Sequence, residues 1–102
     1  MITAVRTASI HDGKIAEALA WAVKVTNYAR DKFGANTQLM RNIGGSAGQI
    51  HWVSTFPSLA DFENARKQIE PDEGYKSLVM EARQQNLFIG TSVVDALYES
   101  IA

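Results

Sequence analysis

One stretch of the sequence, residues 49–66, limits the fold more than any other. Its first part, Gln49–Phe56, is rich in β-branched and aromatic side chains, which favours a strand. Pro57 ends that strand because it lacks the N–H that a sheet requires. Ser58 then supplies a helix N-cap, with Asp61 three residues later as the second half of a capping box. The stretch therefore predicts a central strand that turns directly into a capped amphipathic helix.

The rest of the chain divides by the same rules of periodicity and capping. β-branched runs indicate strands, and apolar residues three or four positions apart indicate helices. Turn residues separate them: Asp12 as an N-cap, Gly34 after a helix end, Pro71 as a helix breaker and Gly90 as a bend. The predicted elements are a strand Ile2–Ile10, a helix Ile15–Phe33, a strand Asn36–Ile43, a strand Gln49–Phe56, a helix Ser58–Ile69 with a second piece Tyr75–Ala82, and a strand Leu87–Tyr98.

This order predicts the ferredoxin-like βαββαβ arrangement, an α+β fold whose antiparallel sheet carries its helices on one face. The pairs expected across the central hairpin are Ile43 with Ile50, Arg41 with Trp52, and Asn42 with His51. Both faces then hold apolar residues, with Met40 and Val53 on the face away from the helices. Because an open sheet normally keeps one face polar, we expect a second copy to cover this face. The result would be a homodimer in the form of a dimeric α/β barrel.

Composition excludes several classes of protein. The 102 residues suit one domain, residues 1–102, and the lack of cysteine excludes disulfides and thiolate metal sites. Ten basic and eleven acidic residues, spread along the chain, leave no basic patch for nucleic acid. No apolar run approaches the ~20 residues that cross a bilayer, and no secretion signal is present. We therefore expect a cytoplasmic protein with no nucleic-acid or membrane partner.

A family resemblance adds to this prediction. Thr55–Arg66 joins an aromatic strand end, a Ser-Leu-Ala turn and an Ala-Arg helix, and Pro71–Tyr75 forms an acidic-then-aromatic break before another helix. These motifs cover about half of the chain and resemble the C-terminal half of NIPSNAP-like domains. The sequence departs from that pattern at Ser54, where the family has a tryptophan; here the tryptophan is Trp52. The resemblance implies the dimeric α/β-barrel group, which also contains antibiotic-biosynthesis monooxygenases and haem-degrading oxygenases.

Few side chains suit catalysis. His51, with Asn42 as an orienting partner across the hairpin, is the candidate catalytic base because histidine titrates near neutrality. The alternative is a strand histidine that only forms hydrogen bonds at an interface. His11 and His51 are far apart, and no carboxylates stand at ligand spacing, so no metal site and no cofactor is predicted. Haem degradation in the related group uses a helix histidine, which this chain lacks.

A ligand pocket is predicted between the helices and the sheet. Arg41 and Trp52, if paired across strands, would make a cation–π contact there, although Trp52 could instead simply fill the core. An arginine in such a place needs a partner, and Arg6 on the first strand raises the same question. The residues predicted to line the pocket, beside His51, are Arg41, Trp52, Phe56 and Tyr75.

Two aromatic residues of the long helix, Trp21 and Tyr28, lie together about 120° from the stripe expected to be buried. That stripe consists of Ile15, Leu19, Ala22, Val23, Thr26, Ala29 and Phe33. The aromatic pair is either covered by neighbouring side chains or forms a pocket wall or subunit contact. Three functions stay open: a protein that binds a small, partly apolar molecule, a cofactor-free monooxygenase or isomerase, and a non-catalytic protein whose larger oligomer is built through Trp21 and Tyr28.

Overall fold

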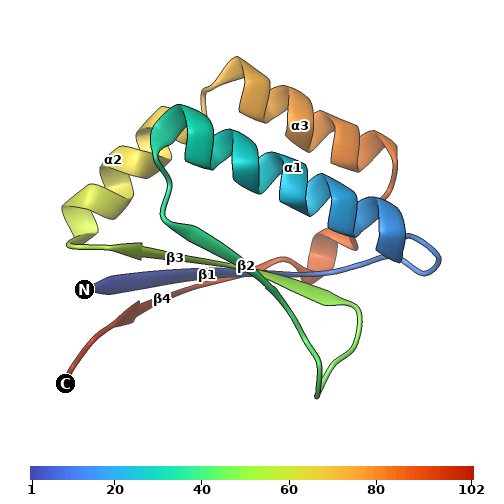
Figure 1. Cartoon of the computed structure of the whole chain (residues 1–102), viewed down its shortest axis with the longest axis horizontal. Helices are drawn as coiled ribbons and strands as arrows, with labels where there is room; N and C mark the ends of the chain where they lie inside the picture. Colours follow the sequence, from blue (N-terminus) through green and yellow to red (C-terminus); the bar gives the residue numbers. More distant parts are fainter.

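In the computed structural model of residues 1–102, a four-stranded sheet carries three helices on one face (Figure 1). Helices α1 and α3 lie side by side, and α2 covers the end of the sheet that holds both termini. None of the helices combines the length and the apolar character needed to span a bilayer. The elements are β1 (Ile2–Ser9), α1 (Ile15–Phe33), β2 (Thr37–Arg41), β3 (Gln49–Phe56), α2 (Leu59–Ile69), α3 (Glu73–Gln84), a 3₁₀ turn η1 (Gly90–Ser92) and β4 (Val94–Glu99).

The sheet has the strand order β2-β3-β1-β4, and every neighbouring pair is antiparallel. The two central strands, β1 and β3, are paired along their whole length, from Ile2 opposite Phe56 to Ser9 opposite Gln49. Helix α1 connects β1 to β2, and helices α2 and α3 connect β3 to β4. In each case one other strand lies between the two connected strands in the sheet, and both connections cross the same face. This topology confirms the predicted ferredoxin-like α+β arrangement.

Side chains that cap the helices explain where two of them begin. Ser58 Oγ accepts a hydrogen bond from the backbone N–H of Asp61 at 3.2 Å, which confirms the predicted N-cap. The second half of the predicted capping box differs, because the Asp61 carboxylate accepts from the Ser58 hydroxyl at 2.8 Å. Asp72 accepts a hydrogen bond from a backbone N–H in the first turn of α3 in the same way. The prediction that Asp12 caps α1 is wrong, because Lys14 occupies the N-cap position and no side chain caps that helix.

Helix α1 presents a different face to the core from the one predicted. Its buried residues are Ala18, Ala22, Val25 and Thr26. Ile15 and Val23, which were expected inside, are 54% and 51% exposed. The buried stripe is rotated toward Trp21 and Tyr28, because α3 packs against that side of α1 as a second cover. The helix ends as predicted, at Gly34 in the left-handed conformation with φ 66°.

The hairpin between β2 and β3 has a different register from the predicted one. The observed pairs are Leu39 with Trp52, Met40 with His51, and Arg41 with Ile50. The predicted pairing of Arg41 with Trp52 is therefore wrong by two residues. Strand β2 ends early because the side chain of Asn42 donates to the carbonyl of Gly44 at 3.1 Å and Gly45 adopts a positive φ, so the turn begins there. A two-residue shift keeps each side chain on its predicted face.

The C-terminal segment, predicted as one strand over Leu87–Tyr98, is interrupted in the structure. Phe88 forms an isolated bridge with Ile10, the turn η1 follows, and only then does β4 begin. The hydroxyl of Ser92 holds this turn to the end of β1 by accepting a backbone N–H at 3.0 Å. The bend expected at Gly90 is therefore a complete turn.

The hydrophobic core is concentrated at the end of the sheet away from the termini. It consists of Ile10 just after β1, Ala18 and Ala22 of α1, Ile50 of β3, Ala82 of α3 and Leu87 after α3. Helix α2, by contrast, contains no buried residue. The space between α2 and the sheet is therefore not filled by the protein itself.

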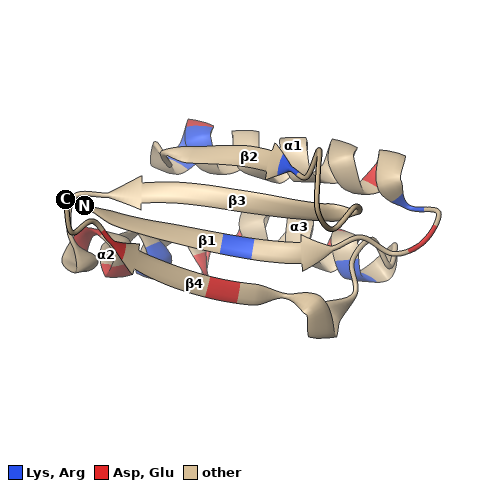
Figure 2. Ribbon diagram, turned by 90° about the horizontal axis from the view of Figure 1, so that it is seen from below, with Lys and Arg blue, Asp and Glu red and all other residues tan.

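The face of the sheet away from the helices carries no acidic or basic side chain apart from one histidine. Strand alternation and the observed register place there Thr3, Val5, Thr7, Ser9, Gln38, Met40, Gln49, His51, Val53, Thr55, Val94, Ala96 and Tyr98. The charged positions of β1 and β4 are Arg6, Asp95 and Glu99, and the register places them on the helix side, alternating with these residues. Figure 2 shows a blue band on β1 and a red band on β4. Met40, Val94 and Tyr98 are exposed in the single chain.

Candidate functional site

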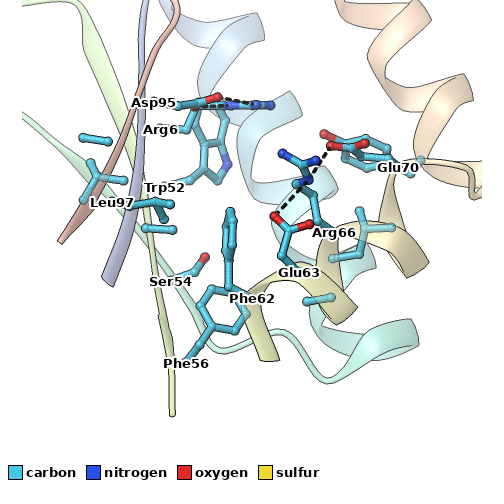
Figure 3. Close-up of a pocket in the computed structure, with 16 residues that line it drawn as sticks. Arg6, Trp52, Ser54, Phe56, Phe62, Glu63, Arg66, Glu70, Asp95 and Leu97 are labelled. Atoms are coloured by element: carbon cyan, nitrogen blue, oxygen red, sulfur yellow. Dashed lines mark hydrogen bonds and ion pairs between the residues drawn. The ribbon is translucent and has the colours of Figure 1, made fainter. Parts of the chain in front are cut away.

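A cavity of about 610 Å³ lies between α2 and the sheet (Figure 3). Its floor comes from β1, β3 and β4, and its outer wall is the inner side of α2, with Tyr75 of α3 at one end. Most of its lining residues are hydrophobic. The volume falls within the usual range of ligand sites, roughly 300–1,000 Å³. The cavity exists because the large core residues are gathered at the other end of the sheet.

Aromatic side chains form the apolar wall of this cavity. The rings of Phe56 and Phe62 meet edge to face, with centroids 5.4 Å apart, where β3 turns into α2. Trp52 stands on the sheet further inside, and its indole N–H donates to Thr26 Oγ1 at 3.1 Å. Its ring also contacts Phe88 edge-on at 6.0 Å, so the orientation of Trp52 is fixed from behind.

The polar part of the cavity is an ion pair between neighbouring strands. Arg6 and Asp95 lie opposite each other in the register of β1 and β4. The guanidinium donates from Nε and Nη2 to the two carboxylate oxygens at 2.7 and 2.8 Å, a bidentate geometry. This hydrogen bonding lowers the pKa of Asp95 and raises the pKa of Arg6, with a smaller contribution from the phenol of Tyr75. Both groups therefore stay ionised at neutral pH.

A second set of charges lies on α2 at the cavity wall. Arg66 Nε is 3.9 Å from a carboxylate oxygen of Glu63 and 3.5 Å from one of Glu70. All three side chains are about half exposed or more. Pairs of this kind contribute between 0 and about 1 kcal/mol to stability and can exchange partners easily. They form a polar wall that can adjust to a bound molecule.

Three of the predicted pocket residues, Trp52, Phe56 and Tyr75, line this one cavity. Arg41 does not: it lies opposite Ile50, at the far end of β2. The reason is the two-residue shift of the hairpin, which moves Arg41 away from Trp52. The arginine that lies beside Trp52 is Arg6, its partner in the register of β1 and β3. The sequence pointed to Arg6 as a charge in need of a partner, but Asp95 is 89 residues away, and only the strand register joins them.

His51 is not in the cavity, because it projects from the opposite face of the sheet. Its Nδ1 lies 2.8 Å from Thr7 Oγ1, and its Nε2 lies 2.6 Å from Asn42 Oδ1. The amide nitrogen of Asn42 donates to Gly44, which directs its oxygen toward the imidazole. Asn42 is thus the predicted partner of His51, although Met40 stands opposite it in the register. Because His51 lies on the other face of the sheet, it cannot reach a molecule in the α2 cavity.

Trp21 and Tyr28 are partly covered by neighbouring side chains of the same chain, which is one of the alternatives predicted for them. The indole N–H of Trp21 donates to the carbonyl of Leu78 at 2.8 Å, and its ring packs edge-on against Trp52 and Phe88. The hydroxyl of Tyr28 donates to Asp72 Oδ2 at 2.5 Å. These aromatic residues join α1 to α3 and to the core within one chain, so their contacts give no support to an oligomer built through them.

The carboxylate of Asp72 connects three functions of this helix junction: it caps α3, accepts from Tyr28, and pairs with Lys32 at 2.5 Å. These hydrogen bonds lower its pKa to about 2. Because the pKa is lower in the folded chain than in the unfolded one, the stabilisation is complete above about pH 5 and is lost as the pH falls toward 2.

We expect Asp72→Asn to lower the Tm at pH 7 and to weaken the dependence of the Tm on pH between 5 and 2. Thermal melts followed by circular dichroism test this prediction, with Asp31→Asn, on the exposed surface of α1, as the control. If the Tm of Asp72→Asn changes with pH as steeply as the Tm of the wild type, the prediction is contradicted.

No protein-family model matches the sequence, and no curated protein does. Several solved structures match in fold. An uncharacterized NIPSNAP domain protein from Burkholderia xenovorans superimposes with a TM-score of 0.83 at 13% identity, over 100% of this chain and 96% of the other. A NIPSNAP family protein of unknown function from Agrobacterium tumefaciens gives 0.80 at 18% identity, over 98% and 87%. An antibiotic biosynthesis monooxygenase gives 0.74 at 13% identity, over 100% of both chains.

This chain has the fold of these proteins. At such low identity the likeness establishes the shared ferredoxin-like architecture, and it confirms the resemblance seen in the sequence motifs at the level of the fold. Function has to be argued from the cavity and from the uncovered face of the sheet.

Proposed function

We propose that this protein is a cytoplasmic homodimer of one-domain chains that binds a small, partly apolar molecule in the cavity between α2 and the sheet. The observation that carries the proposal is the cavity itself, a space of about 610 Å³ with an aromatic wall and one bidentate ion pair. Ligand sites typically combine a largely apolar lining with a few placed polar groups. Contact with an apolar ligand would remove the rings of Phe56 and Phe62 from water, which is favourable.

The uncharged face of the sheet supports the homodimer. About one residue in five of the chain is charged, yet this face has only His51 as an ionisable group apart from the phenol of Tyr98. Exposed Met40 and Val94 add apolar surface. A second copy of the same face would cover both without burying an unpaired charge. Two sheets packed in this way form the dimeric α/β barrel that the sequence motifs imply.

A second candidate function is turnover without a cofactor, because the chain shares its fold with an antibiotic biosynthesis monooxygenase. Apart from Asp95, which is paired with Arg6, the groups in the cavity that are able to accept or hold a proton are Glu63, Glu70 and Tyr75. Oxygen uptake with hydroxylated aromatic compounds, measured with an oxygen electrode, separates turnover from simple binding. Oxygen uptake that is lost in Tyr75→Phe would support an enzyme. If no oxygen uptake is measured, binding is left as the function.

The binding proposal is tested with Nile red, an uncharged aromatic dye whose emission changes in apolar surroundings. We expect saturable binding to the folded protein. Ala65 lies on the inner side of α2, so Ala65→Trp should fill the cavity and weaken binding by at least about tenfold, since a displaced ligand loses its apolar contacts. Ala60→Trp, at an exposed site on the same helix, is the matched control. Equal affinities for the two variants, or no saturable binding by the wild type, would overturn the proposal.

A further inference from the structure

A second, smaller cavity of about 200 Å³ adjoins the first on the α1 side. The two share five lining residues, Arg6, Trp52, Ser54, Ile69 and Tyr75. Beyond them the smaller cavity, here called the inner cavity, is bounded by α1 and the start of β2, with Val25, Ala29 and Ala35 among its walls. The two spaces therefore meet at a junction where Arg6 and Tyr75 are the ionisable groups.

The polar atoms around the inner cavity are already paired within the protein. Thr26 Oγ1 donates to the carbonyl of Ala22 at 2.7 Å and accepts from Trp52. The hydroxyls of Thr37 and Ser54 bond to each other at 2.7 Å, and the indole of Trp21 is bonded to α3. Away from Arg6 and Tyr75, a ligand group in this space meets mainly apolar surface, and the only spare donor is one hydroxyl hydrogen of the Thr37–Ser54 pair. Hydrocarbon is favoured there, because a polar group would lose its bonds to water without replacement.

The junction has the opposite character. Arg6 uses Nε and one Nη2 hydrogen on Asp95, and its Nη1 makes no hydrogen bond within the protein. The hydroxyl of Tyr75 lies close enough to this guanidinium to contribute to the raised pKa of Arg6, and its own O–H can still donate to a ligand. Both groups can donate to one ligand oxygen. A hydrogen bond from a charged donor such as Arg6 is stronger than one between neutral groups.

The balance of charged side chains around the cavity decides whether a charged or an uncharged ligand oxygen is favoured. The guanidinium of Arg6 is neutralised by Asp95, and that of Arg66 has both Glu63 and Glu70 beside it. The cavity lining thus holds two positive and three negative side chains. A carboxylate or phosphate would meet this excess of negative charge without an uncommitted cation. An uncharged carbonyl or hydroxyl oxygen meets no such repulsion and still accepts from Arg6 and Tyr75.

We propose that the ligand is an uncharged carbonyl compound with a short alkyl chain, such as a neutral ketone, ester or amide. Its chain occupies the inner cavity, its oxygen accepts from Arg6 and Tyr75 at the junction, and its remaining part lies in the outer cavity against Phe56 and Phe62. This assignment rests on the proposed binding function and adds the chemical class of the ligand. In this assignment, the size of the inner cavity limits the length of the alkyl chain that can bind.

The test is displacement of Nile red by a series of 2-alkanones and by carboxylates of the same chain lengths at pH 7. We expect the ketone affinity to rise about fourfold for each added CH₂ and to level off once the inner cavity is full. We expect each carboxylate to bind at least tenfold more weakly than its ketone. Tyr75→Phe should weaken the ketones by about two- to tenfold, the effect of one lost hydrogen bond, without changing the dependence on chain length.

Ala29→Leu is designed to shorten the inner cavity, and Ala20→Leu, on the exposed side of α1, is the control. In Ala29→Leu the ketone series should level off at a shorter chain, while Ala20→Leu should match the wild type. Circular dichroism melts establish that both are folded. Affinity that is independent of chain length, or carboxylates that bind more tightly than ketones, would overturn the ligand class while Nile red binding stands. A protein that does not bind Nile red would overturn the binding function itself.

Discussion

Replacing Gly74 with alanine is expected to lower the free energy of unfolding by about 1–3 kcal/mol, the usual cost of overpacking. Gly74 lies in the first turn of α3, directly under the ring of Tyr28. A Cβ atom added there would be 2.6 Å from Tyr28 Cζ and closer still to the hydroxyl oxygen. Real Cβ contacts are longer than this, so one of the two groups has to move.

Tyr28 cannot move away without losing its own contacts. Its hydroxyl donates to Asp72 and accepts from Lys32 at 3.3 Å, and its ring packs edge-on against Phe33. Displacing it would break the hydrogen bonds that join α1 to the start of α3. The absence of a side chain at Gly74 is therefore what allows these two helices to meet.

A double-mutant cycle tests whether the contact with Tyr28 causes this loss of stability. In a Tyr28→Ala background the clash is absent, and alanine is a better helix residue than glycine by up to about 1 kcal/mol. Gly74→Ala should then be neutral or stabilising, whereas in the wild type it is destabilising. Urea unfolding followed by circular dichroism measures both differences. Equal losses in the two backgrounds would show that Tyr28 is not the cause.

The order of elements could be predicted because local signals agreed with one another. The strand that ends at Phe56, the proline after it and the cap at Ser58 all specify the same chain reversal. Face assignments survived the two-residue error in the hairpin, since side chains alternate with a period of two. The error itself arose from the loop after Arg41, where an asparagine side chain and glycines with positive φ begin the turn two residues early.

The site was less predictable because it depends on contacts between distant segments. The Arg6–Asp95 pair needs the register of β4 against β1, which the interruption at Gly90–Ser92 sets and periodicity does not reveal. The sequence left open whether Trp21 is covered or exposed, because no local pattern shows that α3 packs against that side of the helix. By contrast, Trp52, Phe56 and Tyr75 came together on one cavity, since the strand and helix that carry them were predicted correctly.

Placing a carboxylate at the centre of the uncharged sheet face is expected to abolish the proposed homodimer. Val53 lies opposite Val5 in the middle of that face. In Val53→Asp, twofold symmetry would bury the new charge twice in one interface, with no lysine or arginine on either of the two packed faces. We expect the dimer dissociation constant to rise at least about 100-fold, which corresponds to about 2.8 kcal/mol.

Sedimentation velocity across a wide range of protein concentration measures this change. The matched control is Asn27→Asp, which adds the same charge at an exposed position of α1 on the other side of the molecule. We expect wild type and Asn27→Asp to sediment as dimers and Val53→Asp as a folded monomer. A wild-type chain that is monomeric throughout, or a Val53→Asp chain that remains dimeric, would contradict the proposed interface. Nile red binding by the monomeric variant would then show whether one chain alone completes the cavity beneath α2.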